Sequence, residues 1–115
     1  MMHTDNKSIL EKANAAVSAG DNEGYLAYCT EDTLWNFMGD QILEGKEAVR
    51  AYMKQTYIEP KFSTECMIAE GDFVTAIGHI SLKDAEGHMT DYAYCDVWRF
   101  KDGKMAELKA YVVKI

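Results

Sequence analysis

The spacing of apolar residues in the first half of the chain is that of a helix. Apolar positions between Ile9 and Val17 recur three, four and seven or eight residues apart, which places them on one side of a helix. Thr4 or Asp5 can cap the start of this helix, and Gly20 ends it. The pattern therefore predicts an amphipathic helix that covers a core.

Two further helices and one strand are predicted before the middle of the chain. Asp21 can cap a short second helix, and residues 46–57 form a third helix that ends before Pro60, the only proline. Residues 33–39 lie between these helices and are typical of a strand. We thus expect three helices, with a strand between the second and the third.

The second half of the chain changes to an extended pattern. Gly71-Asp72 and Asp102-Gly103 are tight-turn dipeptides between apolar runs, and a looser turn connects the two middle runs. The four predicted strands are residues 61–70, 73–83, 88–101 and 104–114. Strands joined by short turns form an antiparallel meander, so the chain is predicted to be a single α+β domain, residues 1–115, with its helices packed on one face of the sheet.

Gly78 lies inside the long second strand of the meander. A glycine in the interior of a long strand usually marks a bend or bulge. A strongly curved antiparallel sheet with helices across its concave side encloses a cone-shaped cavity, and we expect such a cavity here.

One carboxylate shares a strand face with four aromatic side chains. Because side chains alternate along a strand, Asp96 lies on the same face as Tyr92, Tyr94, Trp98 and Phe100. If this face lines the cavity, loss of hydration raises the pKa of Asp96, and the neutral acid can donate a hydrogen bond or a proton to a ligand oxygen. The alternative is a structural acid that is satisfied by a tyrosine hydroxyl or a cation.

Composition and charge narrow the classes of function. The net charge of −7 argues against nucleic acid and against an anionic membrane surface as partners, and there is no apolar run long enough to span a membrane. The N-terminal segment does not resemble a secretory signal, so we expect a cytoplasmic protein. Cys29, Cys66 and Cys95 are widely spaced, and we interpret them as buried reduced thiols.

Three stretches of the sequence resemble the nuclear transport factor two-like superfamily, which includes ketosteroid isomerase, limonene epoxide hydrolase and the SnoaL-like polyketide cyclases. They are NAAVSAGD at residues 14–21, LEGKEAVRAYM at residues 43–53 and CDVWRFKDGKMAEL at residues 95–108. The order of the predicted helices and strands is also similar to that of this superfamily, from about residue 8 to residue 112. The resemblance implies a cystatin-like α+β cone.

The resemblance matches only some of the catalytic residues of ketosteroid isomerase. Asp96 matches the aspartic acid that ketosteroid isomerase keeps protonated as a hydrogen-bond donor in its oxyanion hole. Asn36 falls where that enzyme has its carboxylate base, and Ala13 falls where it has its oxyanion tyrosine. The resemblance therefore implies the pocket and the acid, and it argues against steroid isomerisation by the same mechanism.

Further residues are candidates for the pocket. Asn36 can orient a ligand through its amide, and Tyr94, Trp98 and Tyr52 can form the pocket wall. His79 is the only histidine in the interior of a predicted strand and is a candidate general base; either sheet face is open to it at this point. No grouping of histidines, cysteines and carboxylates has the spacing of a metal site, so we expect no metal.

Two hypotheses of function follow. In the first, the chain binds a hydrophobic carbonyl or oxygenated compound and acts on it without a cofactor, as an isomerase, lyase or hydrolase, through Asp96. In the second, it is a non-catalytic ligand-binding or dimeric interaction module whose cone is filled by Trp35 and Trp98. Under either hypothesis the outer sheet face, which includes Cys95 and Val97, suits a homodimer, and related proteins commonly pair through that face.

Overall fold

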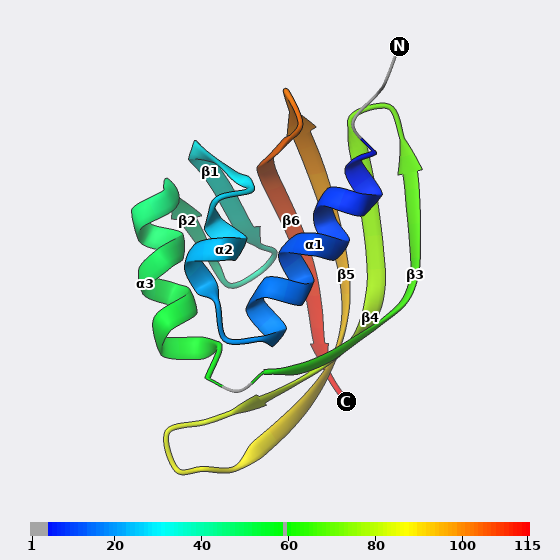
Figure 1. The fold of residues 1–115 in the computed structure, drawn as a ribbon. Coiled ribbons are helices and arrows are strands. Elements are labelled where there is room, and N and C mark those ends of the chain that lie inside the picture. Colours follow the sequence, from blue (N-terminus) through cyan, green and yellow to red (C-terminus); the bar gives the residue numbers. More distant parts are fainter. Residues whose placement is uncertain (1–4, 59) are drawn as a thin grey trace.

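Three helices lie across one face of a six-stranded sheet in the computed structural model, which describes residues 5–58 and 60–115 (Figure 1). The helices are α1 (Asn6–Ser18), α2 (Asn22–Leu26) and α3 (Lys46–Thr56). Asp5 caps α1 by accepting a hydrogen bond from the backbone N–H of Lys7, and Asp21 caps α2 through the N–H of Gly24. Both predicted aspartate caps are confirmed, and Thr4 lies outside the described residues.

The sheet contains the predicted meander and two strands from the first half of the chain. Its members are β1 (Cys29–Phe37), β2 (Gln41–Glu44), β3 (Lys61–Glu70), β4 (Phe73–Lys83), β5 (Met89–Lys101) and β6 (Lys104–Lys114). The strand order is β2-β1-β6-β5-β4-β3, with every pair antiparallel except β1 and β6, which run parallel. The prediction of an α+β fold is confirmed, but the sheet is mixed rather than wholly antiparallel, and the short strand β2 was not expected.

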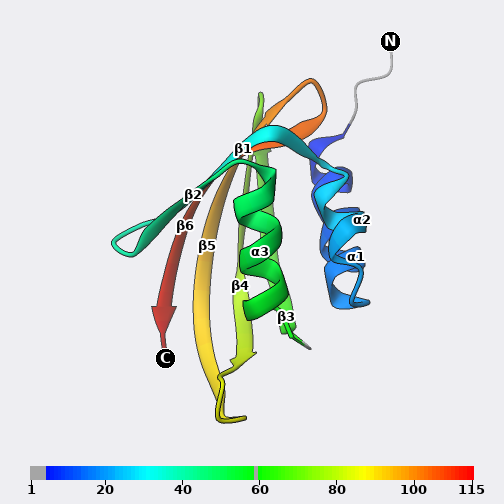
Figure 2. The same ribbon diagram turned by 90° about the vertical axis from the view of Figure 1, so that its left-hand side faces the viewer.

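The sheet is bent where Gly78 of β4 meets β3. The pairing of β3 with β4 shifts by one residue between Thr64 and Cys66, so a bulge lies next to Gly78. A Cβ atom at Gly78 would lie 2.0 Å from the carbonyl oxygen of Ser63, so only glycine allows this close approach of the strands. Figure 2 shows the bowed strands edge-on, with the helices on one side.

The core lies between the sheet and the helices. The buried residues of α1 are Ile9, Leu10, Ala13 and Val17, and α3 adds Val49 and Met53. From the sheet, the largest buried side chains are those of Trp35, Trp98 and Phe100. The periodic positions of the first half and the aromatic face of β5 thus pack against each other.

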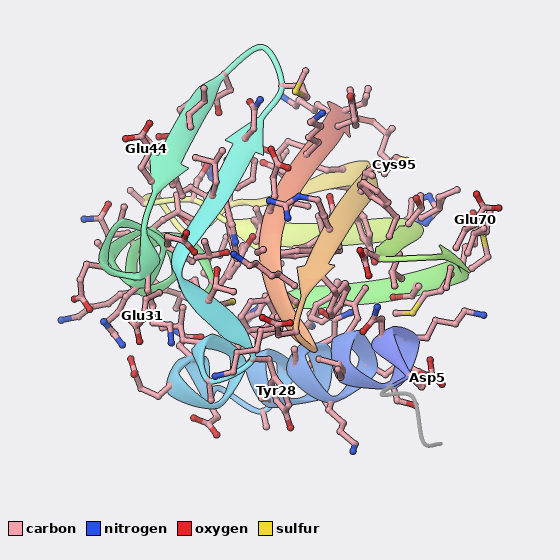
Figure 3. All side chains as sticks on the ribbon, turned by 90° about the horizontal axis from the view of Figure 1, so that it is seen from above. Asp5, Tyr28, Glu31, Glu44, Glu70 and Cys95 are labelled. Carbon is pink, nitrogen blue, oxygen red and sulfur yellow. The ribbon has the colours of Figure 1, made fainter. Side chains whose placement is uncertain are left out.

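The three cysteines differ in burial. Cys29 is buried, Cys95 is partly buried and Cys66 is exposed, so the prediction of three buried thiols is wrong for Cys66. Cys66 lies on edge strand β3, where no further strand covers it. Figure 3 shows Cys95 on the side of the sheet away from α1 and α2. Among the described residues, no helix is long and apolar enough to cross a membrane.

Candidate functional site

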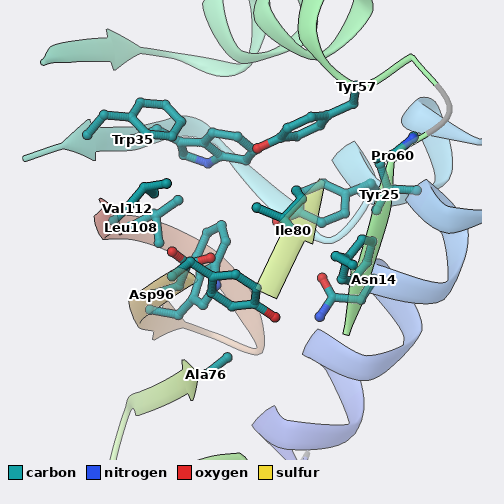
Figure 4. A pocket seen from close by; sticks show the side chains of 16 residues that line it. Asn14, Tyr25, Trp35, Tyr57, Pro60, Ala76, Ile80, Asp96, Leu108 and Val112 are labelled. Carbon is teal, nitrogen blue, oxygen red and sulfur yellow. The ribbon is translucent and has the colours of Figure 1, made fainter. Parts of the chain in front are cut away.

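A cavity of about 80 Å³ lies between the concave face of the sheet and the helices (Figure 4). Side chains from α1, α2, the end of α3 and five strands surround it. They are Asn14, Val17, Tyr25, Trp35, Phe37, Tyr57, Pro60, Phe62, Ala76, Ile80, Tyr94, Asp96, Trp98, Leu108, Ala110 and Val112. The wall is mostly apolar and aromatic, with few polar groups, as is typical of a small-molecule site.

Among the described residues that line this wall, Asp96 is the only carboxylate. On β5 it pairs with Ala76 of β4 on one side and with Ala110 of β6 on the other, and paired residues point to the same sheet face. The two small side chains leave space above the carboxyl group, so that it borders the cavity (Figure 4). The predicted placement of Asp96 among aromatic residues on the concave face is confirmed.

The Asp96 carboxyl group has no hydrogen-bond partner among the described residues. Burial removes water that would stabilise the carboxylate, and this raises the pKa of Asp96 to about 7. Near neutral pH the group is therefore present in both its protonated and its ionised form. A carboxyl group of this kind can donate a proton and accept one at the same pH.

Three tyrosines lie near this acid. Burial is the main cause that raises the pKa of Tyr25, Tyr57 and Tyr94, and the charge of Asp96 adds to it in each case. The phenols are thus neutral at physiological pH and remain hydrogen-bond donors. Tyr94 donates to the backbone carbonyl of Ser63 and is bonded to the Thr64 hydroxyl, both at 3.1 Å.

Two tryptophans narrow the cavity without filling it. The rings of Trp35 and Trp98 lie edge to face, with centroids 5.7 Å apart, and Tyr25 packs against both. The buried indole N–H of Trp35 has no hydrogen-bond partner among the described residues. Figure 4 shows this nitrogen on the side of the ring that faces Asp96.

The predicted pocket residues divide into two groups. Tyr94 and Trp98 line the cavity, as expected. Tyr52 does not line it, because its ring packs behind the wall. The centroid of this ring lies 5.0 Å from that of Phe37 and 5.7 Å from that of Tyr57. Tyr52 therefore supports the wall and does not contact the cavity.

The prediction that Asn36 shares the pocket with Asp96 is wrong. In the parallel pairing of β1 with β6, Phe37 is opposite Ala110, whereas Asn36 is opposite Lys109. Ala110 is the neighbour of Asp96 on the concave face, so Asn36 points to the outer face. Its neighbours Trp35 and Phe37 enter the cavity wall instead.

His79 also lies on the outer face. It is exposed and is paired with Ala93 of β5 and Ser63 of β3, away from the cavity. It therefore cannot act as a base toward a molecule next to Asp96. Within residues 5–58 and 60–115, no cluster of three or more potential ligands is arranged for a metal ion.

Several residues of the wall were not predicted. Asn14, Tyr25 and Tyr57 come from helices or helix ends, whose contribution depends on how the helices pack on the sheet. Trp35 was expected only as a residue that fills the cone. Phe37 was not predicted, although it alternates along β1 with the buried residues Thr33 and Trp35. Ala13, which falls where ketosteroid isomerase has its oxyanion tyrosine, is fully buried. The next residue, Asn14, lines the cavity.

The SnoaL-like domain family matches residues 10–108 of this chain, which is most of its length. Among curated proteins, no sequence is significantly similar. Solved structures agree with the family. An NTF2-like protein of unknown function from Burkholderia pseudomallei is similar with a TM-score of 0.82 and 18% identity, over 96% of this chain and 91% of the other.

Two further structures are those of proteins with a described ligand or reaction. SalBIII, an epoxide hydrolase/cyclase-like enzyme in pyran ring formation in the polyether salinomycin, is similar with a TM-score of 0.85, 19% identity and 93% and 89% coverage. TerC, co-crystallised with polyporic acid, is similar with a TM-score of 0.77, 16% identity and 91% and 88% coverage. At these identities the likeness shows the fold, and the predicted NTF2-like cone is confirmed.

Proposed function

This chain belongs to the SnoaL-like domain family, and from its cavity we propose that it binds a small, largely apolar molecule that carries an oxygen next to Asp96, and acts on it. The reaction is a cofactor-independent isomerisation or ring closure with Asp96 as general acid. The single observation that carries this proposal is the carboxyl group of Asp96, which borders an aromatic cavity and has no hydrogen-bond partner among the described residues.

The chemistry follows from the fact that Asp96 is the one proton-exchanging group among the described residues of the cavity wall. His79 is on the outer face, and the tyrosines of the wall are neutral, so Asp96 has to serve both as the donor and as the acceptor of a proton. Such a site suits a reaction in which the proton that is given to one oxygen is returned from another atom of the same molecule. No separate base is then required.

Intramolecular opening of an epoxide fits this requirement, and ring formation by the relative SalBIII makes it the first reaction to test. The carboxyl proton of Asp96 passes to the epoxide oxygen as its C–O bond breaks. A hydroxyl group of the same molecule attacks the carbon and forms the new C–O bond, and its proton returns to the Asp96 carboxylate. Atoms and charge balance, and the acid is regenerated.

The experiment is a rate measurement with 4,5-epoxypentan-1-ol, which isomerises to tetrahydrofuran-2-ylmethanol and is followed by proton NMR. The wild-type protein is expected to accelerate the isomerisation above the rate in buffer, and the Asp96→Asn and Asp96→Leu variants are expected to lose the acceleration. Asp32→Asn, a change at an exposed aspartate of β1, is the matched control and retains it. Equal rates for wild type and Asp96→Leu would refute catalysis by Asp96.

We also propose that the outer sheet face forms a homodimer. A row of apolar or weakly polar residues crosses four strands on this face, through Cys66, Ile77, Cys95 and Tyr111. Tyr111 is 44% exposed, and nearby Val113 is 61% exposed. An exposed apolar sheet face of this extent supports a self-complementary contact between two copies.

Light scattering on the purified protein tests this interface. We expect a mass of about two chains at micromolar concentration, and we expect Tyr111→Glu to give a monomer, because the contact would bury an unpaired charge. Ile58→Glu is the control, since Ile58 is also exposed but follows α3. A monomeric wild type would exclude the dimer.

A further inference from the structure

A second hollow lies beside the cavity, along the seam between α1 and edge strand β3. This groove has a volume of about 690 Å³. One wall is a polar stripe of α1, which includes Lys7, Glu11, Asn14 and Ser18, positions that a helix places on one side. The other wall is β3, with Phe62 and Thr64 among its residues.

The groove and the cavity share two residues. Asn14 and Phe62 line both of them, so the two spaces meet at these residues. The side-chain amide of Asn14 is partly buried and has no hydrogen-bond partner among the described residues. Figure 4 shows this amide directed toward the cavity. An amide that has both a donor and an acceptor free at such a junction is suited to bind a polar group of a ligand.

A second polar contact lies at the same junction. Thr64 lines the groove and Tyr94 lines the cavity, and their hydroxyl groups are 3.1 Å apart in a hydrogen bond. Hydroxyl and amide groups thus lie where the apolar cavity and the groove meet. A ligand that crosses from one space to the other therefore meets polar groups in its middle part.

The volumes argue for a ligand that uses both spaces. The cavity of about 80 Å³ is smaller than the engineered cavity of about 150 Å³ that holds benzene. It therefore accommodates only a head group of a larger molecule. The groove provides space for the remainder, and its nearby charges are Asp5, Lys7 and Glu11, which sum to −1 in a chain of net charge −7. An anionic tail is disfavoured there.

We propose that the cavity and the groove form one binding site for an elongated amphiphilic ligand. Its apolar, oxygen-bearing head lies next to Asp96, a hydroxyl, carbonyl or amide in its middle binds Asn14, and a neutral or cationic polar tail lies between α1 and β3. Asn14 is then the residue that selects for the middle part of the ligand. This inference rests on the proposed binding of the head group in the cavity.

Two probes distinguish the head from the tail. The short probe is butan-2-one, and the long probe is 4-oxopentanamide whose amide nitrogen carries a di(ethylene glycol) chain. Dissociation constants for both are measured by NMR titration. We expect the wild-type protein to bind the long probe at least tenfold more tightly than the short one, because only the long probe reaches Asn14 and the groove.

Variants locate the source of this advantage. Ser18→Trp places a large side chain in the groove, and Asn14→Leu removes the amide at similar size. Each is expected to reduce the preference for the long probe to less than twofold. Lys12→Trp is the matched control on an exposed position of α1 outside the groove, and it is expected to keep the tenfold preference.

The outcomes separate this inference from the function on which it rests. If the short probe binds in an Asp96-dependent manner but the long probe has no advantage, the elongated site is overturned and the cavity proposal stands. An advantage that persists in Ser18→Trp also overturns the elongated site. Failure of both probes to bind wild type would overturn both proposals.

Discussion

Asp96 lies directly across from Ala110 on the neighbouring strand, and both side chains point to the concave face of the sheet. The methyl group of Ala110 is too small to cover the carboxyl group and cannot form a hydrogen bond with it. The acid thus borders a cavity in which neither water nor a protein donor fully stabilises its charge. This relationship determines how Asp96 titrates.

The stability of the fold is expected to depend on pH through Asp96. Its pKa rises from 3.8 to about 7 on folding, so between these values the folded protein binds a proton that the unfolded chain releases. The contribution of Asp96 to the free energy of unfolding is therefore favourable below about pH 4 and is lost as the pH rises to 7. The loss is on the order of 4 kcal/mol.

Asp96→Asn isolates this contribution, because asparagine is neutral at every pH. The variant is expected to be more stable than wild type at pH 8, with the difference disappearing as the pH falls toward 4. Urea denaturation at several pH values measures it. Asp32→Asn, at an exposed aspartate of β1, is the matched control for the change of charge. Parallel curves for wild type and Asp96→Asn would mean that Asp96 binds its proton equally well in the folded and unfolded states, which contradicts a raised pKa.

Replacement of Asp96 by leucine is expected to separate stability from ligand binding. Asp96→Leu removes a buried polar group and should fold with at least the stability of wild type at neutral pH. It should weaken the binding of butan-2-one by about 2 kcal/mol, because the ketone oxygen loses its hydrogen-bond donor in a buried site. Calorimetric titration of the two proteins tests this. Equal affinities would make Asp96 a structural acid.

Gly78→Ala is expected to destabilise the fold by about 3 kcal/mol, since the added methyl group would overlap the carbonyl oxygen of Ser63. The same methyl group would lie 2.8 Å from the hydroxyl oxygen of Tyr94. In the double variant with Tyr94→Phe, only the second contact is relieved, so part of the loss should remain. Denaturation of both single variants and the double variant measures the coupling, and a fully stable Gly78→Ala would show that β3 can move away.

The sequence predicts the fold well because its turns are local signals. Gly71 and Gly103 adopt positive φ angles, and the strands on either side of them pair as the turn dipeptides indicate. The parallel contact of β1 with β6 has no local signal, since it joins residues about seventy positions apart. The strand β2 was missed because its four residues are short and mostly exposed.

The site was predicted only in part, for reasons that differ between residues. Asp96 was found because alternation along β5 places it in an aromatic face. The resemblance to the superfamily places Asn36 in the pocket. The alternation of Trp35 and Phe37 along β1 instead places Asn36 on the outer face of the sheet. The positions of Asn14 and Tyr57 depend on helix packing, which the pattern of one sequence does not specify.

The cavity raises the pKa of Asp96 to about 7, so that a large share of this carboxyl group is protonated near neutral pH. Carbon-13 NMR of the Asp96 side-chain carboxyl group, followed from pH 3 to pH 9 and assigned with Asp96→Asn, tests this claim most directly. We predict a titration midpoint near pH 7 for this carboxyl group. A midpoint at or below 3.8 would show an ordinary, stabilised carboxylate and would contradict the account.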